Sequence, residues 1–185
     1  MYEAVHAHPD GQSTVARLAK TAADYGFEGV VVRNHADARA EYDPERIRDE
    51  YGIDVVEGVE IRTDDRQSAS GAVGNYRTTE TIVAVHGGTN AMNRFAVEQA
   101  KVDVLAHPMA DDGDINHVLV KAAVENGVRL EFDLSGALRQ SGGRRVRTLQ
   151  SLRKLREIVD HYDAPYVVSA EPTSHLEVRA PRELK

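Results

Sequence analysis

Residues 111–134 read DDGDINHVLVKAAVENGVRLEFDL and place a helix directly before a strand. Asp114 can cap the helix through its carboxylate, and Asn126-Gly127 can end it. The apolar residues between them recur at the three-and-four spacing of one buried face, namely Ile115, Val118, Leu119, Ala122 and Ala123. From Val128 to Leu134 apolar and charged residues alternate, which is the two-residue period of a strand. The stretch therefore predicts one helix–strand unit.

The same unit recurs along the chain. Helices are predicted for Thr14–Tyr25, which ends at Gly26, and for Asp43–Tyr51, which has Pro44 at its first helical position. Seven strands are predicted, at Glu3–His6, Gly29–Arg33, Asp54–Ile61, Thr81–Val85, Asp103–Ala106, Val128–Leu134 and Pro165–Ser169. Repeated units of this kind imply a parallel sheet, either closed or open and doubly wound. Seven strands in this length favour an α/β barrel of the TIM type, smaller than the roughly 250 residues of the eight-stranded form.

Length and composition limit the class of protein. A chain of 185 residues can bury one sizeable core, so we expect a single domain over residues 1–185. The irregular stretch Thr63–Thr78 is rich in Ser, Gly, Asp and Arg and is predicted to be a mobile surface loop. The absence of an apolar run near the roughly 20 residues of a membrane span, and of a signal peptide, predicts a cytosolic protein. Without cysteine, metal ligands are limited to imidazole and carboxylate.

Charge is unevenly distributed along the sequence. The formal net charge is -7 and Arg far outnumbers Lys, which suggests a salt-rich cytoplasm, although high-GC coding favours Arg as well. Between Arg139 and Arg156 there is no Asp or Glu. A helix is predicted from near Arg144, after Gly142-Gly143, to Tyr162. The apolar side of that helix is expected to be buried and consists of Leu149, Leu152, Leu155 and Val159.

The basic residues of this segment and of the C-terminal stretch are candidates for contact with an anionic partner. They are Arg139, Arg144, Arg145, Arg147, Arg153, Lys154, Arg179 and Arg182. Guanidinium groups beside a glycine hinge can bind phosphates of structured RNA in bidentate geometry, or they can meet an acidic protein. No aromatic residue interleaves with them, so stacking on bases is not predicted. The alternative is a solvated face that pairs with acidic neighbours.

Polar side chains also stand at the predicted strand ends. In α/β barrels the carboxyl ends of the strands form the face that carries chemistry. The candidate metal ligands at these positions are His6, His8, His35, Glu60 and His107. A polar rim of this kind can equally be kept for hydrogen bonding and packing alone.

This pattern resembles the polymerase and histidinol phosphatase (PHP) metallohydrolases, in which a His-x-His after the first strand and later ligands hold a metal cluster that activates water. The resemblance implies a PHP-like barrel. The Asp and His expected after the last strand are missing, because Ser169 is followed by Ala170-Glu171-Pro172-Thr173 and His175 has the wrong spacing. We therefore assign no catalytic residue and expect any divalent metal here to be vestigial.

A second resemblance is ordered over the C-terminal part of the chain and looser before it. It is carried by Gly113–Leu119, Val128–Leu134, Leu155–Tyr162, Ala164–Ser169 and Glu177–Arg182. Together these segments resemble the ribonuclease P protein component 3 family of archaea and eukaryotes. Relatives in that family usually continue beyond the position of Pro181-Arg182, so a further C-terminal segment is expected.

The second resemblance implies a non-catalytic subunit that assists RNA-catalysed removal of 5′ leaders from precursor tRNA. In that family the RNA subunit cleaves with magnesium ions, so this chain is expected to need no cofactor of its own. The implied partners are the catalytic RNA, precursor tRNA and a small ferredoxin-like protein subunit. No association with a membrane is expected. Two alternatives stay open: a PHP-type metal-dependent phosphoesterase using His6, His8, Glu60 and His107, and a protein-interaction barrel without RNA contact.

Overall fold

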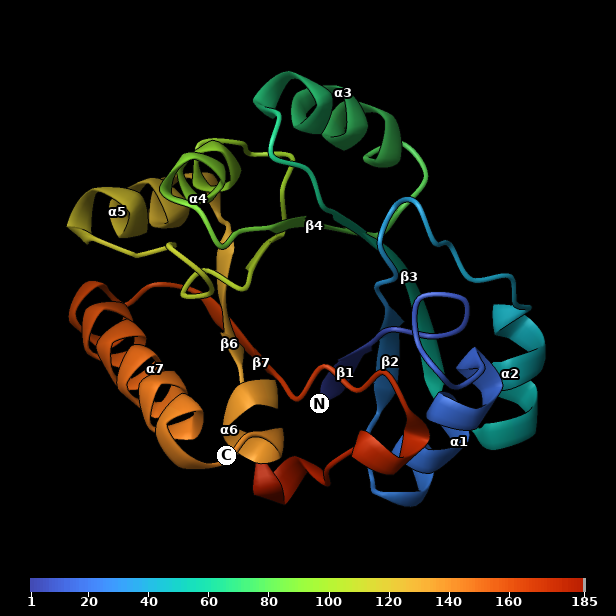
Figure 1. The fold of residues 1–185 in the computed structure, drawn as a ribbon. Helices are drawn as coiled ribbons and strands as arrows, with labels where there is room; N and C mark the ends of the chain where they lie inside the picture. The colour runs from blue at the N-terminus through green and yellow to red at the C-terminus, as the bar shows by residue number, and fades with distance from the viewer. Residues whose placement is uncertain (185) are drawn as a thin grey trace.

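A computed structural model describes residues 1–184, in which seven parallel strands form one sheet that curves into a nearly closed barrel (Figure 1). The strands lie side by side in chain order. They are β1 (Tyr2–Val5), β2 (Gly29–Val32), β3 (Asp54–Ile61), β4 (Ile82–His86), β5 (Val104–Ala106), β6 (Arg129–Asp133) and β7 (Tyr166–Ser169). The predicted TIM-like α/β barrel is therefore confirmed.

Helices connect the strands and cover the outside of the barrel (Figure 1). They are α1 (Val15–Asp24), α2 (Pro44–Tyr51), α3 (Arg66–Tyr76), α4 (Asn90–Val97), α5 (His117–Asn126), α6 (Ser135–Arg139) and α7 (Gly142–Tyr162). Two short 3-10 turns, η1 (His175–Glu177) and η2 (Pro181–Glu183), follow the last strand. Among residues 1–184, no helix combines the length and the apolar character needed to cross a membrane.

The apolar core lies between the sheet and the surrounding helices. One cluster joins β1 and β2 to α1 and α2 through side chains such as Leu18, Val30 and Ile47. A second cluster joins β3 to β6 with α3, α4, α5 and α7, and includes Leu105 and Leu155. Because the apolar side chains face outward to the helices, the carboxyl end of the barrel interior is left to polar side chains.

The barrel closes between β1 and β7 through a side chain, because no backbone ladder joins these two strands in the described chain. The Ser169 hydroxyl donates to Glu3 Oε1 at 2.5 Å, and the Ala170 backbone N–H donates to the same oxygen at 2.9 Å. Further along, the His6 backbone N–H donates to the Pro172 carbonyl at 3.1 Å. Glu3 is fully buried, and burial raises the pKa of its carboxyl to about 7 despite these hydrogen bonds.

The helix before β6 starts later than predicted. α5 begins at His117, because Asn116 rather than Asp114 caps it by accepting from the Val118 backbone N–H at 3.0 Å. The predicted buried face is also wrong at one position, since Val118 is 53% exposed and Val120 is buried. Consecutive apolar residues here fit either face, so spacing alone could not choose between them.

The prediction of a mobile loop over Thr63–Thr78 is wrong, because α3 occupies most of this stretch. Asp65 caps the helix by accepting from the Ser68 backbone N–H at 2.7 Å. Ala69 and Val73 lie one turn apart and are buried against the barrel. Since the buried stripe consists of few and mostly small residues, the sequence shows almost no apolar period.

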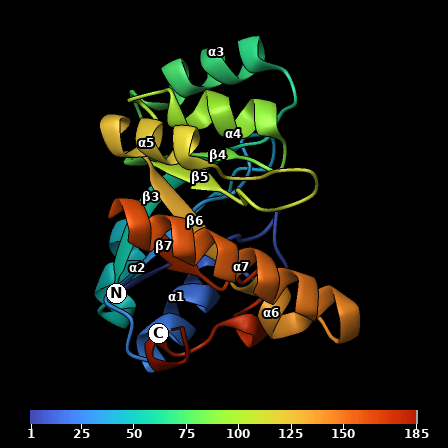
Figure 2. The ribbon, with the colours of Figure 1, turned by 90° about the vertical axis from the view of Figure 1, so that its left-hand side faces the viewer.

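α7 extends past the carboxyl ends of the strands (Figure 2). At 1.5 Å per residue its length is about 31 Å, roughly twice that of the neighbouring strands. Leu155 and Val159 are buried as predicted, whereas Leu152 is half-buried and Leu149 is 45% exposed. The predicted apolar side is therefore buried only in the second half of the helix. We call residues 142–150 the α7 overhang.

The Glu3 carboxyl makes barrel closure sensitive to pH. Its pKa rises from 4.5 in the unfolded chain to about 7 in the fold, so between these values the folded state keeps a proton that the unfolded state has lost. Stability should fall as pH rises through this window. Glu3→Gln keeps the acceptor for Ser169 and removes the titration. Relative to the wild type, its unfolding free energy should rise by up to about 3 kcal/mol between pH 4.5 and 8, measured by urea unfolding at constant salt. A pH-independent difference between the two proteins would contradict this account.

Candidate functional site

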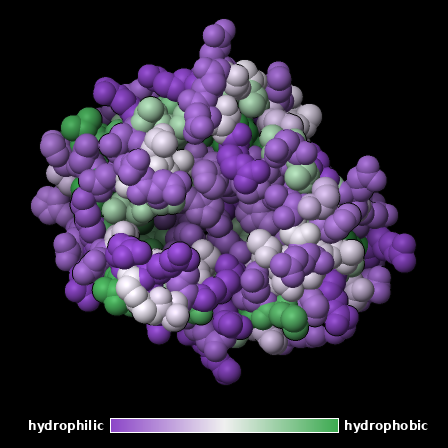
Figure 3. Space-filling model, in the orientation of Figure 1, coloured by the Kyte–Doolittle hydropathy of each residue, from purple (hydrophilic) through white to green (hydrophobic). Residues whose placement is uncertain are grey.

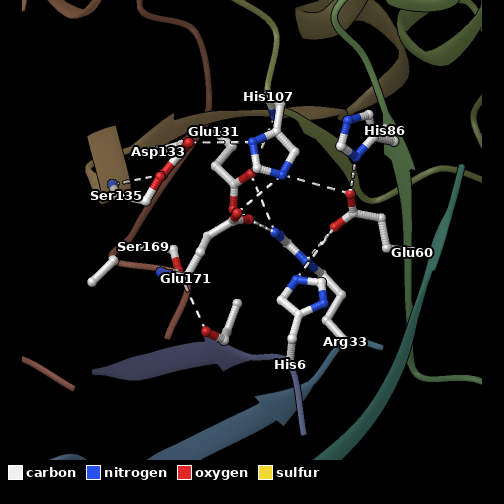
Figure 4. A network of polar contacts seen from close by, with 12 residues as sticks. His6, Arg33, Glu60, His86, His107, Glu131, Asp133, Ser135, Ser169 and Glu171 are labelled. Atoms are coloured by element: carbon white, nitrogen blue, oxygen red, sulfur yellow. Dashed lines mark hydrogen bonds and ion pairs between the residues drawn. The ribbon is translucent and has the colours of Figure 1, made fainter. Parts of the chain in front are cut away.

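Polar side chains at or just after the carboxyl ends of all seven strands meet at one end of the barrel, where hydrophilic residues surround a hollowed centre (Figures 3 and 4). The carboxyl ends of parallel strands lie at one edge of the sheet, which explains why residues far apart in sequence converge. We call this set the rim cluster. Its members are His6, Asp10, Arg33, His35, Glu60, His86, His107, Glu131, Asp133 and Glu171. The cluster unites His6, His35, Glu60 and His107 of the predicted ligands.

Arg33 lies at the centre of the rim cluster and is 2% exposed. Its Nη1 donates to Glu131 Oε1 at 2.7 Å, its Nη2 donates to Glu171, and its Nε lies 3.1 Å from Glu60 Oε2. Burial alone would lower the pKa of Arg33, but these carboxylates raise it well above its usual value. Because Arg33 follows β2 and Glu131 belongs to β6, the ion pairs cross the inside of the barrel.

Glu60 is fully buried and faces imidazole rings as well as Arg33. His86 Nδ1 donates to Glu60 Oε1, and the Nε2 atoms of His35 and His107 lie 3.5 and 3.7 Å from the same oxygen. Burial alone would raise the pKa of Glu60, but the charge of Arg33 and the contacts with His35 and His86 hold it well below its usual range. Glu60 is therefore a carboxylate at neutral pH.

His107 presents both ring nitrogens to carboxylates. Its Nδ1 lies 3.3 Å from Asp133 Oδ2, and its Nε2 lies 3.0 Å from Glu171 Oε2. Burial alone would lower the pKa of His107, but the charge of Glu171 and the hydrogen bond to Asp133 raise it to about 12. Both flanking carboxylates therefore favour the protonated form of the ring. Burial raises the pKa of Glu131 to about 7, against the pull of Arg33.

Asp10 links two imidazole rings on the other side of the cluster. The Nδ1 atoms of His6 and His35 both donate to Asp10 Oδ2 at 2.8 Å, and the His35 backbone N–H donates to it at 2.9 Å. Burial alone would raise the pKa of Asp10, but these hydrogen bonds hold it below its usual range. This carboxylate is therefore already satisfied by protein donors.

His8, the second residue of the predicted His-x-His pair, does not join the rim cluster. Its side chain is exposed and lines a separate cavity with Arg39 and Glu41. The chain turns sharply after β1, where the Asp10 backbone N–H donates to the Ala7 carbonyl at 2.9 Å. This turn directs His8 outward and brings Asp10 back toward the barrel.

Two of the predicted basic residues are held by the fold itself. Arg139 donates to the carbonyls of Ala170 and Glu171, at 2.6 and 3.0 Å, and pairs with Glu177 at 3.4 Å. Lys154 pairs with Asp114 at 2.7 Å. These contacts connect α6 and α7 to neighbouring loops. Arg139 and Lys154 would have to break them in order to bind a partner.

The other predicted arginines of α7 point into solvent. Arg144, Arg145, Arg147 and Arg153 are exposed and form no ion pair with any residue of the described chain. Arg144 and Arg147 line a cavity of about 430 Å³ that also borders His107 and Asp133 of the rim cluster. The α7 overhang and the rim cluster therefore share one concave surface. Arg179 and Arg182 lie after β7 instead, and Arg182 borders a separate cavity beside Asp24.

The sequence profile of the family described as RNase P subunit p30 matches residues 1–185. This chain belongs to that family. The p30-family relatives named ribonuclease P protein component 3 include a protein of Haloarcula marismortui, 62% identical over 184 residues that cover 100% of this chain and 78% of the relative. Another, from Natronomonas pharaonis, is 64% identical and covers 100% of this chain and 77% of its own length. The resemblance predicted from the sequence is confirmed.

Solved structures support the same family and fold. A chain in a cryo-EM structure of archaeal ribonuclease P with mature tRNA superimposes on this protein with a TM-score of 0.84 and 25% identity. The match covers 100% of this protein and 79% of the chain in the cryo-EM structure. A candidate histidinol phosphatase of Listeria monocytogenes superimposes with a TM-score of 0.65, covering 99% of each chain. Since the second match is only 9% identical, it shows a PHP-like fold and nothing more.

The residues of the p30-family rim cluster do not fit a divalent metal as they stand. The sets of possible ligands with atoms within 4.8 Å of one another are His35–Glu60–His86, His6–Glu60–Glu171, His107–Asp133–Glu171 and His6–Asp10–His35. Each of the first three sets uses Glu60 or Glu171, which Arg33 already neutralises. In the fourth set, Asp10 already accepts from both rings. A metal would therefore compete with a cation that belongs to the chain.

Several cluster members were missed by the sequence analysis of this p30-family chain. They are Asp10, Arg33, His86, Glu131, Asp133 and Glu171. A signal was present in β6, where Leu130 packs against the helices and Glu131 points into the barrel. The charged face of that predicted strand therefore points into the barrel and not toward solvent. A second signal was Arg33, which stands directly after the apolar run of β2.

Loss of the Arg33 charge should destabilise the fold strongly. Arg33→Met keeps an apolar stem but leaves Glu60, Glu131 and Glu171 without their shared cation, which should cost about 3–5 kcal/mol in urea unfolding. Adding Glu60→Gln should recover part of that loss, because the charge of a carboxylate that Arg33 had neutralised is removed. As a control, Arg94→Met breaks an exposed pair with Glu98 and should cost at most about 1 kcal/mol. Equal losses in the two single variants would contradict a central role for Arg33.

Proposed function

We propose that this chain is the p30-type protein subunit of an archaeal ribonuclease P and takes part in tRNA processing. The observation that carries this proposal is the family match over residues 1–185, together with the TM-score of 0.84 to a chain of archaeal ribonuclease P with mature tRNA. We further propose that the subunit supplies no catalytic group and that cleavage rests with the RNA subunit and its magnesium ions. The rim cluster agrees with this, because Asp10, Glu60 and Glu171 are each engaged by cations or donors of the chain itself.

The α7 overhang is the surface best suited to RNA. Its arginines are exposed, are close together and have no acidic partner in the described chain. Each guanidinium can therefore offer two parallel N–H groups to a phosphate without first breaking an ion pair. The overhang also stands beyond the carboxyl ends of the strands (Figure 2), so a nucleic acid can reach it without passing over the other helices of the barrel.

A salt-rich cytoplasm would limit electrostatic attraction between the protein and RNA to groups in close contact. The chain is acidic, with a net charge of -7, and relatives come from Haloarcula marismortui and Natronomonas pharaonis. At 1 M salt the Debye length is about 3 Å, so only groups in direct contact with a phosphate contribute much. The proposed function therefore depends on a few well-placed arginines and not on a basic surface as a whole.

Other partners follow from the family resemblance. We propose that the catalytic RNA and tRNA meet the α7 overhang, and that a small ferredoxin-like protein subunit binds elsewhere on the barrel. We also propose that residues 1–185 fold as one domain and that the subunit acts in the cytoplasm with the rest of the enzyme. These points rest on the resemblance and on the family of the relatives.

A metal-dependent phosphoesterase is the alternative function. It is favoured by the PHP-like fold, which a candidate histidinol phosphatase shares. Two observations weigh against it. His8 lies outside the rim cluster, and Arg33 neutralises Glu60, which such an enzyme would need as a ligand. Hydrolysis of phosphate esters by the purified chain, abolished by Glu60→Gln, would favour this alternative.

Reconstitution tests the subunit role. The catalytic RNA and the remaining protein subunits of a halophilic archaeal ribonuclease P would be assembled with and without this chain, at low magnesium. We expect the chain to raise the rate of precursor-tRNA cleavage, because a protein subunit offsets phosphate repulsion that magnesium would otherwise have to screen. A cleavage rate unchanged by the chain at every magnesium concentration would argue against the proposal.

Charge reversal tests the α7 overhang. Arg144→Glu, Arg145→Glu and Arg147→Glu together should weaken binding to the catalytic RNA about tenfold or more and lower the salt slope of binding by about 3, one for each lost phosphate contact. The matched control is Arg17→Glu, Arg46→Glu and Arg66→Glu, which makes the same change of charge on α1, α2 and α3, away from α7 (Figure 1).

Circular dichroism of both triple variants would verify their folding. An equal loss in the two would show that net charge matters and not the overhang. No loss in either would favour a barrel that contacts only proteins.

A further inference from the structure

The rim cluster is arranged around a cation that belongs to the chain. Nε, Nη1 and Nη2 of Arg33 face three different carboxylates, those of Glu60, Glu131 and Glu171. These carboxylates come from β3, from β6 and from the segment after β7, so they approach the guanidinium from different sides of the barrel (Figure 4). Buried carboxylates repel one another unless a cation lies between them. Their positions are therefore those of a cation-binding site.

The same residues form a donor set of the kind that binds transition metals. Ligand atoms of His6, Glu60 and Glu171 all lie within 4.8 Å of one another. In the described chain, the buried His35 Nε2, Glu60 Oε2 and Arg33 Nε form no hydrogen bond, and Arg33 Nε lies 3.1 Å from Glu60 Oε2 as an ion pair only. Imidazole nitrogen and carboxylate oxygen suit Zn²⁺ and Mn²⁺, and Zn²⁺ bonds these donors at about 2.0–2.2 Å. The guanidinium of Arg33 contacts Glu60 and Glu171, so it holds the place of the ion that would neutralise them.

We propose that the Arg33 guanidinium replaces a divalent metal in this barrel, and that its removal creates a divalent-metal site from Glu60, Glu171 and the neighbouring imidazoles. In the native chain the rim then binds no divalent metal. A guanidinium is charged at every accessible pH and cannot dissociate from the chain. At a few ångströms in a buried site it repels a second cation strongly. This inference is independent of the ribonuclease P role.

A purely structural ion pair is the competing interpretation of Arg33. In that case the space left by a shorter side chain would collapse or fill with water, and the remaining ligands would have no particular affinity for metals. The two interpretations differ in one measurable property, which is whether a folded variant without the guanidinium takes up a metal ion that the wild type refuses.

Metal binding to the full chain decides between them. Wild type, Glu60→Gln, Arg33→Ala, Arg33→Ala with Glu60→Gln, and Arg39→Ala would be stripped with a chelator and titrated with ZnCl₂ and with MnCl₂, by calorimetry and by metal analysis after dialysis. Arg39→Ala is the matched control, because it removes an arginine paired with Glu80 at 2.7 Å outside the rim cluster. Thermal unfolding with and without metal gives a second readout, since a ligand bound only by the folded state raises Tm.

We expect Arg33→Ala to bind about one metal ion per chain and to gain thermal stability from it. Wild type and Arg39→Ala should do neither, and Glu60→Gln should abolish binding in the double variant. If Arg33→Ala is unfolded after chelation, recovery of its circular dichroism on adding Zn²⁺ or Mn²⁺ supports the proposal. The proposal is overturned if the wild type holds a metal ion that Glu60→Gln removes. It is overturned equally if Arg33→Ala shows neither binding nor metal-dependent refolding.

Discussion

The carboxyl end of this barrel depends on the balance of buried charge around Arg33. An unpaired carboxylate inside a protein costs several kcal/mol, and Glu60, Glu131 and Glu171 would each carry that cost if the guanidinium were absent. The contacts run across the barrel, so they fix the distances between strands that are not neighbours in the sheet. A different solution operates at the seam between β1 and β7, where Glu3 accepts from Ser169 and burial makes its carboxyl a weaker acid. Two kinds of buried acid thus hold the same sheet closed.

The distribution of charge outside the barrel follows a different rule. The chain as a whole is acidic, and several of its exposed arginines and lysines are paired with acids, as Arg77 is with Asp103. The α7 overhang differs because it brings Arg144, Arg145 and Arg147 close together, with no acidic partner in the described chain. General acidity disfavours unrelated nucleic acids, and the proposed phosphate contacts are confined to this group of arginines. This arrangement agrees with a subunit that supports an RNA enzyme.

Local patterns in the sequence predicted the barrel well and the site only in part. The strands could be predicted because runs such as residues 54–61 are bounded by glycine and by capped helices, and each such signal is local. α3 could not, because its contact stripe of small residues leaves no apolar period. The rim cluster posed a harder problem, since Glu131 in an alternating strand looks the same whether its face meets water or a closed interior. Only closure of the sheet decides which, and closure depends on contacts between residues far apart in sequence. The prediction of His8 as a metal ligand is wrong for a related reason. A turn after β1 directs the His8 side chain away from the barrel, which the His-x-His spacing does not show.

In α7, the residues that pack in the apolar core are separate from the residues proposed to contact RNA. Side chains in residues 142–150 contribute little to the apolar core, whereas Leu155 and Val159 further along the helix belong to it. Substitutions in the projecting part should therefore carry little penalty to folding, so the proposed RNA contacts there can change while the barrel stays intact. The helix thus gives evolution a place to tune recognition independently of architecture.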